Sequence, residues 1–212
     1  MRVPQPLANQ MYESRHGEEV IASLVGPHVR SAPAPGPAPK QRERPGPPVA
    51  PGSPAKNASS DEPGCADGAR VTNNLWGERW SKLVANVMGN GLSACTGLTG
   101  GQMLESELIR RFSTRLGSEA IRVGQAQGYQ LEEILHLPPE TIARAGEGDE
   151  AAMKACDEQR FKDGKRTSSE QRPSMGQDMQ KGRRTEIDFL NGHVVREGEK
   201  VGIACRANAV LT

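Results

Sequence analysis

Residues 73–101 read NNLWGERWSKLVANVMGNGLSACTGLTGG and carry the first regular apolar pattern of the chain. Apolar side chains recur there at the spacing of an α-helix, at Trp76, Trp80, Leu83, Val84, Val87 and Met88. Beside them Lys82, Asn86 and Asn90 follow one another every four residues, so they share an adjoining stripe of the same helix. We expect one helix with a packing face and, next to it, a lysine followed by two carboxamides.

The residues that follow predict further helices and no strand. Apolar spacing indicates a long helix ending at Gly128, and Pro138 and Pro139 suit the first turn of a short one. A last long helix should end at Gly202, and another begins near the end of the sequence. The expected helical segments are 103–127, a short one from 138, 149–161, 174–201 and the beginning of one at 207–212. This part of the chain should therefore be all-α, with four or five helices.

Residues 1–70 differ in composition from the rest. All but three of the 16 prolines lie in the first 63 residues, and the three exceptions are Pro138, Pro139 and Pro173. Residues 31–68 mix these prolines with alanine, glycine and charged side chains, leaving almost nothing apolar to bury. We expect two regions: a low-complexity, largely disordered tail over 1–70 with polyproline-II stretches, and a helical domain over 71–212.

Charge and cysteine content exclude several classes of function. The chain has 27 basic and 26 acidic side chains, interspersed, so no basic face predicts a nucleic-acid partner. No apolar run approaches the ~20 residues that span a bilayer, and the start lacks the apolar core of a secretory signal. The four cysteines are scattered, which favours free thiols over a metal site or a disulfide framework. We expect a cytoplasmic protein.

A glycine pattern at residues 89–94 spells G-x-G-x-x-A, as dinucleotide-binding loops do. That motif works only where a strand leads through a tight turn into a helix, because the helix amides then meet a pyrophosphate. Here the glycines follow a helix. We expect no cofactor at this position.

Five polar residues are the candidates for function. Asn86 and Asn90 are poor residues for a helix interior, so a stripe holding both suits the binding of a small polar ligand. Ser174 is spaced as a helix N-cap, with Gln177 completing a capping box. Glu186 lies next to apolar positions and should be partly buried, with Lys82 as an available cation.

Two stretches resemble a known family. They are LWGERWSKLVANVMGN (75–90) and QRPSMGQDMQKGRRTEIDFLNGHVVREGEKVGI (171–203), which contain W-x-K-L-x-x-N and T-E-I-D-x-x-N-G. Over about 72–212 the chain resembles the C-terminal domain of ketopantoate reductase (2-dehydropantoate 2-reductase). The resemblance implies a helical substrate-binding domain of the 6-phosphogluconate dehydrogenase C-terminal-like type. It also implies an oxidoreductase of pantothenate and coenzyme A biosynthesis, in which NADPH reduces ketopantoate to pantoate, and a homodimer as one expected assembly.

The resemblance implies a role for each of the five residues. Lys82 would be the catalytic lysine, donating a proton to the keto oxygen. Asn86 and Asn90 would hold the substrate, and Ser174 would contact its carboxylate. Glu186 would lie on the cofactor side and position the lysine.

The chain also departs from the family pattern. Gly100 and Gly101 stand where the family has a further substrate-contacting asparagine, and the final helix is cut off near Thr212. Residues 1–70 do not resemble the NADPH-binding Rossmann domain, and a shifted reading frame is one hypothesis for them. We therefore expect a fragment that is inactive by itself. The alternative is a non-catalytic helical association domain with a disordered tail.

Overall fold

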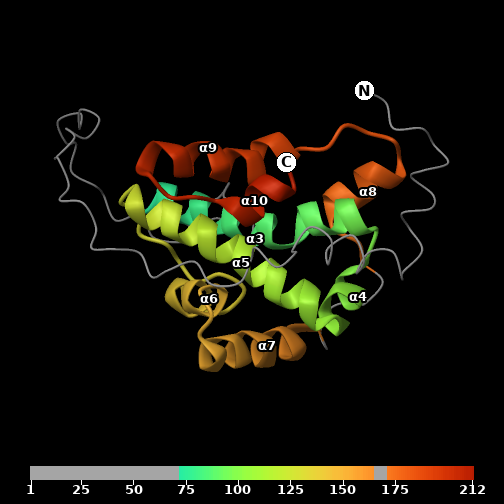
Figure 1. The fold of residues 1–212 in the computed structure, drawn as a ribbon, viewed down its shortest axis with the longest axis horizontal. Coiled ribbons are helices and arrows are strands. Elements are labelled where there is room, and N and C mark those ends of the chain that lie inside the picture. The colour runs from blue at the N-terminus through green and yellow to red at the C-terminus, as the bar shows by residue number, and fades with distance from the viewer. Residues whose placement is uncertain (1–71, 165–170) are drawn as a thin grey trace, which may run out of the picture. The chain divides into compact units, whose positions relative to one another are not determined.

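The structure is a computed structural model that describes residues 72–164 and 171–212 (Figure 1). The expectations for residues 1–70 lie outside these ranges. The described residues form eight α-helices and one 3-10 helix, and they contain no strand. The helices are α3 (Leu75–Thr96), α4 (Gly100–Glu105), α5 (Glu107–Ala126), α6 (Pro139–Gly146), α7 (Glu150–Gly164), α8 (Ser174–Gln180), η2 (Ile187–Phe189), α9 (Asn191–Val201) and α10 (Arg206–Val210). The all-α prediction is confirmed, although the helices outnumber the four or five expected.

The first long helix, α3, ends where a left-handed residue is available. Gly97 has φ 71°, and its N–H donates to the carbonyl of Ser93 at 2.9 Å. Thr99 then begins α4 with a capping box: its hydroxyl accepts from the N–H of Gln102, whose side-chain oxygen accepts from the N–H of Thr99 at 2.9 Å.

Two long helices, α3 and α5, form the centre of the domain and run antiparallel. Gly124 of α5 lies against the ring of Trp80, and Gly117 lies against Met88. The indole N–H of Trp80 donates to the carbonyl of Ala120 at 2.9 Å. Glycines at these two positions of α5 let the helix axes approach closely, because a β-carbon would collide with either α3 side chain.

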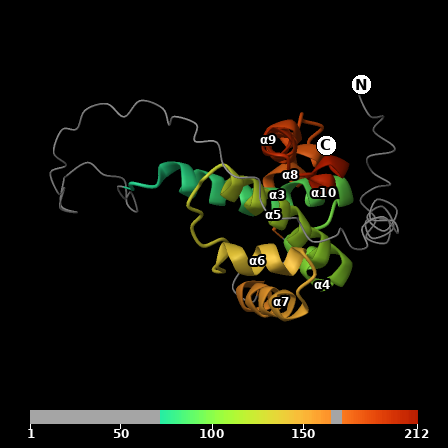
Figure 2. The ribbon, with the colours of Figure 1, turned by 60° about the vertical axis from the view of Figure 1, so that its left-hand side comes forward.

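The remaining helices cover different sides of this pair. Helix α6 packs on α5 and α7 packs on α6, so these two form layers below α5 in the view of Figure 2. Helix α8 packs on α3, while α9 and α10 pack on α5. The buried side chains of the core include Val84, Val87, Leu116, Ile121, Ile142 and Val194. No helix in the described ranges is long and apolar enough to cross a membrane.

The predicted helix over 103–127 is two helices. Ser106 interrupts it with extended backbone, at φ −82° and ψ 118°, and its hydroxyl accepts from the N–H of Ile109 to cap α5. A serine that serves as N-cap for the next helix therefore separates α4 from α5.

The single long helix expected over 174–201 is also wrong. The chain leaves α8 at Gln180, turns at Gly182 with φ 64°, and forms only η2 before α9 begins at Asn191. Met175 and Val194 are both buried as expected. They belong to separate helices, and apolar periodicity alone could not detect the break between them.

Trp76 was expected to pack inward, and this is wrong. Its side chain is 63% exposed, and the guanidinium of Arg79 lies over its ring at 5.4 Å from the centroid. The packing face of α3 begins instead at Trp80, which is 6% exposed.

Candidate functional site

Helix α3 carries the predicted polar stripe. Lys82 is exposed, whereas Asn86 and Asn90 are half-buried. All three lie within one uninterrupted helix, which fixes them on one stripe as the spacing predicted. In the ranges that the structure describes, none of the three side chains forms a hydrogen bond or an ion pair. The two half-buried carboxamides therefore have no hydrogen-bond partner among the described residues.

Ser174 is the first residue of α8. Its hydroxyl does not cap the helix: Pro173 occupies the N-cap position, and the Gln177 side chain donates to the carbonyl of Arg172 at 2.9 Å. The capping-box interpretation of Ser174 is therefore wrong. The side chain is exposed and lines the cavity described below.

Glu186 precedes η2, and its carbonyl accepts from the N–H of Phe189 at 2.9 Å. The expectation that Glu186 is partly buried is wrong, because the residue is exposed. No ion pair joins it to Lys82 within the described residues. The neighbouring Ile187 packs instead on Gly91 of α3, where a β-carbon would lie 3.0 Å from its Cδ1 atom.

The structure brings two of the three elements of the predicted site to the same end of α3. Helix α8 meets α3 where Gly176 lies against Ser93, and η2 meets it at Gly91. Both contacts are next to Asn90. Lys82 lies nine residues before Gly91, about 13 Å along the axis at 1.5 Å per residue.

A residue that the sequence analysis did not single out connects these elements. Asn191 is fully buried, and its side-chain nitrogen donates to Asn208 Oδ1 at 2.9 Å and to the carbonyl of Val87 at 3.4 Å. It thereby links the start of α9 to α10 and α3, and holds η2 beside Gly91. Its place in T-E-I-D-x-x-N-G was the signal that could have identified it.

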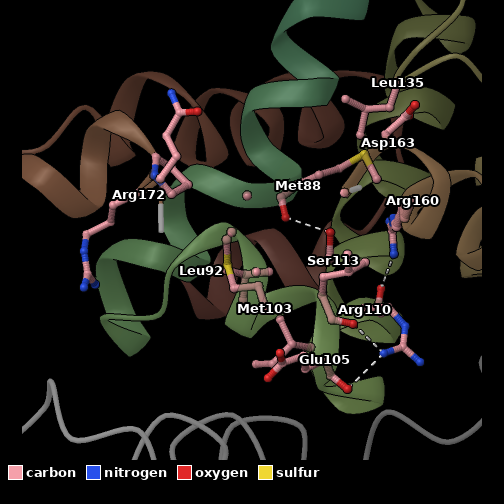
Figure 3. A pocket seen from close by; sticks show the side chains of 18 of the residues that line it. Met88, Leu92, Met103, Glu105, Arg110, Ser113, Leu135, Arg160, Asp163 and Arg172 are labelled. Carbon is pink, nitrogen blue, oxygen red and sulfur yellow. Dashed lines mark hydrogen bonds between the residues drawn. The ribbon is translucent and has the colours of Figure 1, made fainter. Parts of the chain in front are cut away.

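A cavity of about 860 Å³ lies beside the polar stripe (Figure 3). Apolar side chains of α3, α4 and α5 form much of its wall. They are Met88, Leu92, Met103, Leu104 and Ile109. Ala85 and Gly89 of α3 and Ser174 of α8 also line it. Sequence patterns did not predict this cavity, because it depends on how α4 and α7 lie against the central pair.

Two arginines brace one side of the cavity. Arg110 donates from Nη1 to the carbonyl of Leu104 at 2.7 Å and pairs through Nε with Asp157 at 3.0 Å. Arg160 donates from Nη1 to the carbonyl of Arg110 at 3.0 Å, as Figure 3 shows. Burial lowers the pKa of the Arg160 guanidinium, and the charge of Arg110 acts in the same direction. These contacts tie α4, α5 and α7 together around the opening.

The described residues do not fit a dinucleotide. Gly89 and Gly91, which spell the candidate loop, both lie inside α3, so their amides are used by the helix itself. The strand that such a loop requires does not occur in 72–164 or 171–212. No group of histidine, cysteine and acidic side chains in these ranges could hold a metal ion.

Residues 74–212 match the family model described as ketopantoate reductase PanE/ApbA C terminal. The 2-dehydropantoate 2-reductase of Archaeoglobus fulgidus is 27% identical over 143 residues, which cover 68% of this chain and 40% of that protein. The enzyme of Streptococcus pyogenes serotype M6 is 33% identical over 127 residues, covering 58% and 34%. The chain thus spans well under half the length of these relatives.

Two solved structures are also similar to this chain. A PanE/ApbA family ketopantoate reductase from Ralstonia eutropha is 31% identical with a TM-score of 0.49, covering 66% of this chain and 40% of that one. A dimeric ketopantoate reductase from Staphylococcus aureus is 19% identical with a TM-score of 0.50, covering 66% and 42%. The latter supports the helical fold.

Proposed function

The chain belongs to the ketopantoate reductase family, because residues 74–212 match the C-terminal domain of that family. On this premise we propose that residues 74–212 bind a 2-keto acid, ketopantoate, for reduction. The observation that carries the proposal is the stripe of Lys82, Asn86 and Asn90 on α3. Its polar side chains form no hydrogen bond or ion pair among the described residues, although asparagine is unfavourable in a helix interior.

Each residue of the site has a separate task in this proposal. The carboxamides of Asn86 and Asn90 hydrogen-bond the polar groups of the acid and fix its orientation. The hydroxyl of Ser174 donates to the carboxylate. Lys82 holds a proton at Nζ and donates it to the C2 oxygen as negative charge develops there. Glu186 positions the lysine once the site is closed around the substrate, because in the described residues the two side chains are not paired.

The hydride donor of the family, NADPH, is not accommodated by the described residues, as the geometry of Gly89 and Gly91 indicates. We therefore assign to this domain only substrate binding, orientation and proton supply. The 212-residue chain is proposed to be inactive alone. Titrating it with NADPH while following nicotinamide fluorescence tests this point, and binding at micromolar concentrations would contradict it.

Substrate binding can be tested on the same chain. Ketopantoate should raise its melting temperature, because a ligand that binds only the folded state stabilises it. Asn86→Ala should abolish the increase. Gln180→Ala, at an exposed position at the end of α8, is the control and should retain it. An equal shift in wild type and Asn86→Ala would show that the stripe is ordinary helix surface.

The proton donor needs its own comparison. In a chain supplied with a cofactor domain, Lys82→Gln should lower kcat by about 10²–10⁴-fold, the range of general-acid catalysis. Lys154→Gln, at an exposed lysine of α7, should leave kcat unchanged.

A second candidate function, self-association, is favoured by exposed apolar side chains. Leu75 and Trp76 are 46% and 63% exposed at the start of α3, and Phe189 is 69% exposed in η2. Apolar groups in such positions are suited to an interface between protein surfaces. A homodimer is compatible with the substrate-binding role.

A further inference from the structure

We infer that the cavity between α3, α4, α5 and α7 receives a bulky apolar substituent of the 2-keto acid, so that the preferred substrate is larger and more apolar than ketopantoate. The inference rests on the proposed function, since it extends the same site. It concerns the part of the ligand that points away from the keto group.

The size of the cavity is the first argument. Cavities of roughly 300–1,000 Å³ typically enclose drug-sized ligands, and this one is about 860 Å³. A compact acid such as ketopantoate would fill a small part of it. Contact between apolar walls and water is unfavourable. A ligand whose apolar group displaces that water therefore binds more tightly.

The position of the cavity is the second argument. Ser174, the proposed contact of the carboxylate, lines it directly. Ala85 and Gly89 also line it, and they are the chain neighbours of Asn86 and Asn90 on α3. An acid held at the stripe therefore needs to extend only across one face of the helix to enter the cavity.

The character of the wall is the third argument. Met88, Leu92 and Met103 surround the space in Figure 3, and two methionines allow the wall to adjust to the shape of a ring or a branched chain. Charged side chains of both signs, Arg160, Glu105 and Asp163, also line the cavity, so the apolar substituent would contact the part of the wall formed by Met88, Leu92 and Met103.

Gly89 provides a way to close the cavity. A β-carbon added to Gly89 would meet nothing within 4 Å, so a larger side chain can enter the space without displacing a neighbour. Leucine at this position would occupy the volume assigned to the apolar substituent. It would leave the carboxamides of the stripe in place.

The experiment compares two acids that share the keto and carboxylate groups, 2-oxobutanoate and 4-phenyl-2-oxobutanoate, by calorimetric titration of the full chain. The phenyl compound should bind at least about tenfold more tightly. Gly89→Leu should remove most of this gain and leave the affinity for 2-oxobutanoate within about twofold of wild type. Ala126→Leu adds the same side chain at an exposed position outside the cavity and should leave both affinities unchanged.

The outcomes separate the inference from the proposed function. Equal affinities for the two acids, or a phenyl gain that survives Gly89→Leu, overturn the inference. If ketopantoate binding still depends on Asn86 in that case, the proposed function stands. If no keto acid binds the folded chain, both fall. Ser113→Leu, which fills the cavity from α5, replaces Gly89→Leu if the latter fails to fold.

Discussion

Glu119 is a buried carboxylate that pairs with Arg115 at 3.6 Å and accepts hydrogen bonds from two backbone amides and one side-chain amide. It is 5% exposed and accepts from the N–H of Ala207 at 3.0 Å, the N–H of Asn208 at 3.1 Å and the Asn208 side chain at 2.9 Å. It therefore occupies the amides at the start of α10, which have no partner within that helix. Glu119 of α5 thus helps to hold α10 in place, together with the hydrogen bond from Asn191 to Asn208.

Loss of this carboxylate should be costly. We expect Glu119→Ala to lower the free energy of unfolding by about 3 kcal/mol, because it leaves buried donors without an acceptor. Urea unfolding of the purified chain measures the change. Glu199→Ala, at an exposed position of α9, should change the stability by less than about 0.5 kcal/mol. Similar values for the two variants would mean that the amides of α10 find other partners.

For the five candidate residues, the sequence predicted the relative positions of three but not the environments of the other two. The shared stripe of Lys82, Asn86 and Asn90 followed from spacing alone, because the helix is regular. The environments of Ser174 and Glu186 did not. Whether a serine caps a helix depends on where the helix begins, here one residue after Pro173. The exposure of a glutamate depends on which neighbours cover it.

The contact between α3 and α5 depends on glycine. Gly124→Ala should destabilise the domain by about 2 kcal/mol, because the added carbon collides with the buried ring of Trp80. Gly89→Ala on α3 is the matched control, since nothing lies within 4 Å of its added carbon. It should stabilise by up to ~1 kcal/mol through helix propensity. Thermal unfolding measures both, and the same sign for the two variants would contradict the packing argument.

The link between α5 and α6 should depend on pH. Arg122 pairs with Glu140 at 2.7 Å and with Glu147 at 2.6 Å. The hydrogen bond from Arg122 is the largest cause that lowers the pKa of Glu140 below its ordinary value of 4.5. Because the folded pKa is depressed, the contribution of the pair is present above the unfolded value and is lost as pH falls through the folded one.

A variant of Arg122 isolates this effect. Arg122→Gln should cost about 1 kcal/mol at pH 7, a small value because Glu140 is 54% exposed and solvent screens the pair. The difference from wild type should shrink as pH falls below about 4.3 and vanish in stronger acid. Urea unfolding at a series of pH values downward from 7 tests this. A difference that does not shrink as the pH falls would assign the effect to packing of the arginine stem.

Element boundaries were the part of the fold that sequence predicted least well. Apolar periodicity located α5, although it joined that helix to the end of α4, and two prolines located the start of α6. Periodicity also merged α8, η2 and α9 into one helix. Gly182 was the one local signal of the break between α8 and η2. The periodicity of a single sequence predicts which residues are buried. It does not predict whether those residues belong to one helix or to two.

At the scale of the whole molecule, α3 organises the proposed site. It carries the polar stripe and part of the cavity wall, and it contacts both α8 and η2. The family could be recognised from two signature stretches of sequence, one on α3 and one around η2. The all-α fold was predicted from the spacing of apolar residues. The cavity could not, since it depends on how α4, α7 and α8 lie against the central pair of helices.

The start of α3 presents an apolar surface whose role can be tested on the intact chain. Trp76 is 63% exposed, and Leu75 beside it is 46% exposed. Burial of these side chains against a second copy would release free energy of roughly 25 cal/mol per Å² of apolar surface. We therefore expect the chain to associate with increasing concentration, and Trp76→Ser to shift the equilibrium toward monomer by at least about tenfold.

Sedimentation velocity over a range of concentrations measures that equilibrium. Val210→Ser is the control, because Val210 is 42% exposed on α10 and truncation there should leave the equilibrium unchanged. Equal effects of the two variants would indicate nonspecific attraction between apolar groups. If the chain is monomeric at all concentrations, Trp76 does not mediate self-association. Loss of association in Trp76→Ser with ketopantoate binding intact would place the interface outside the polar stripe, so that one domain could bind substrate and a partner at the same time.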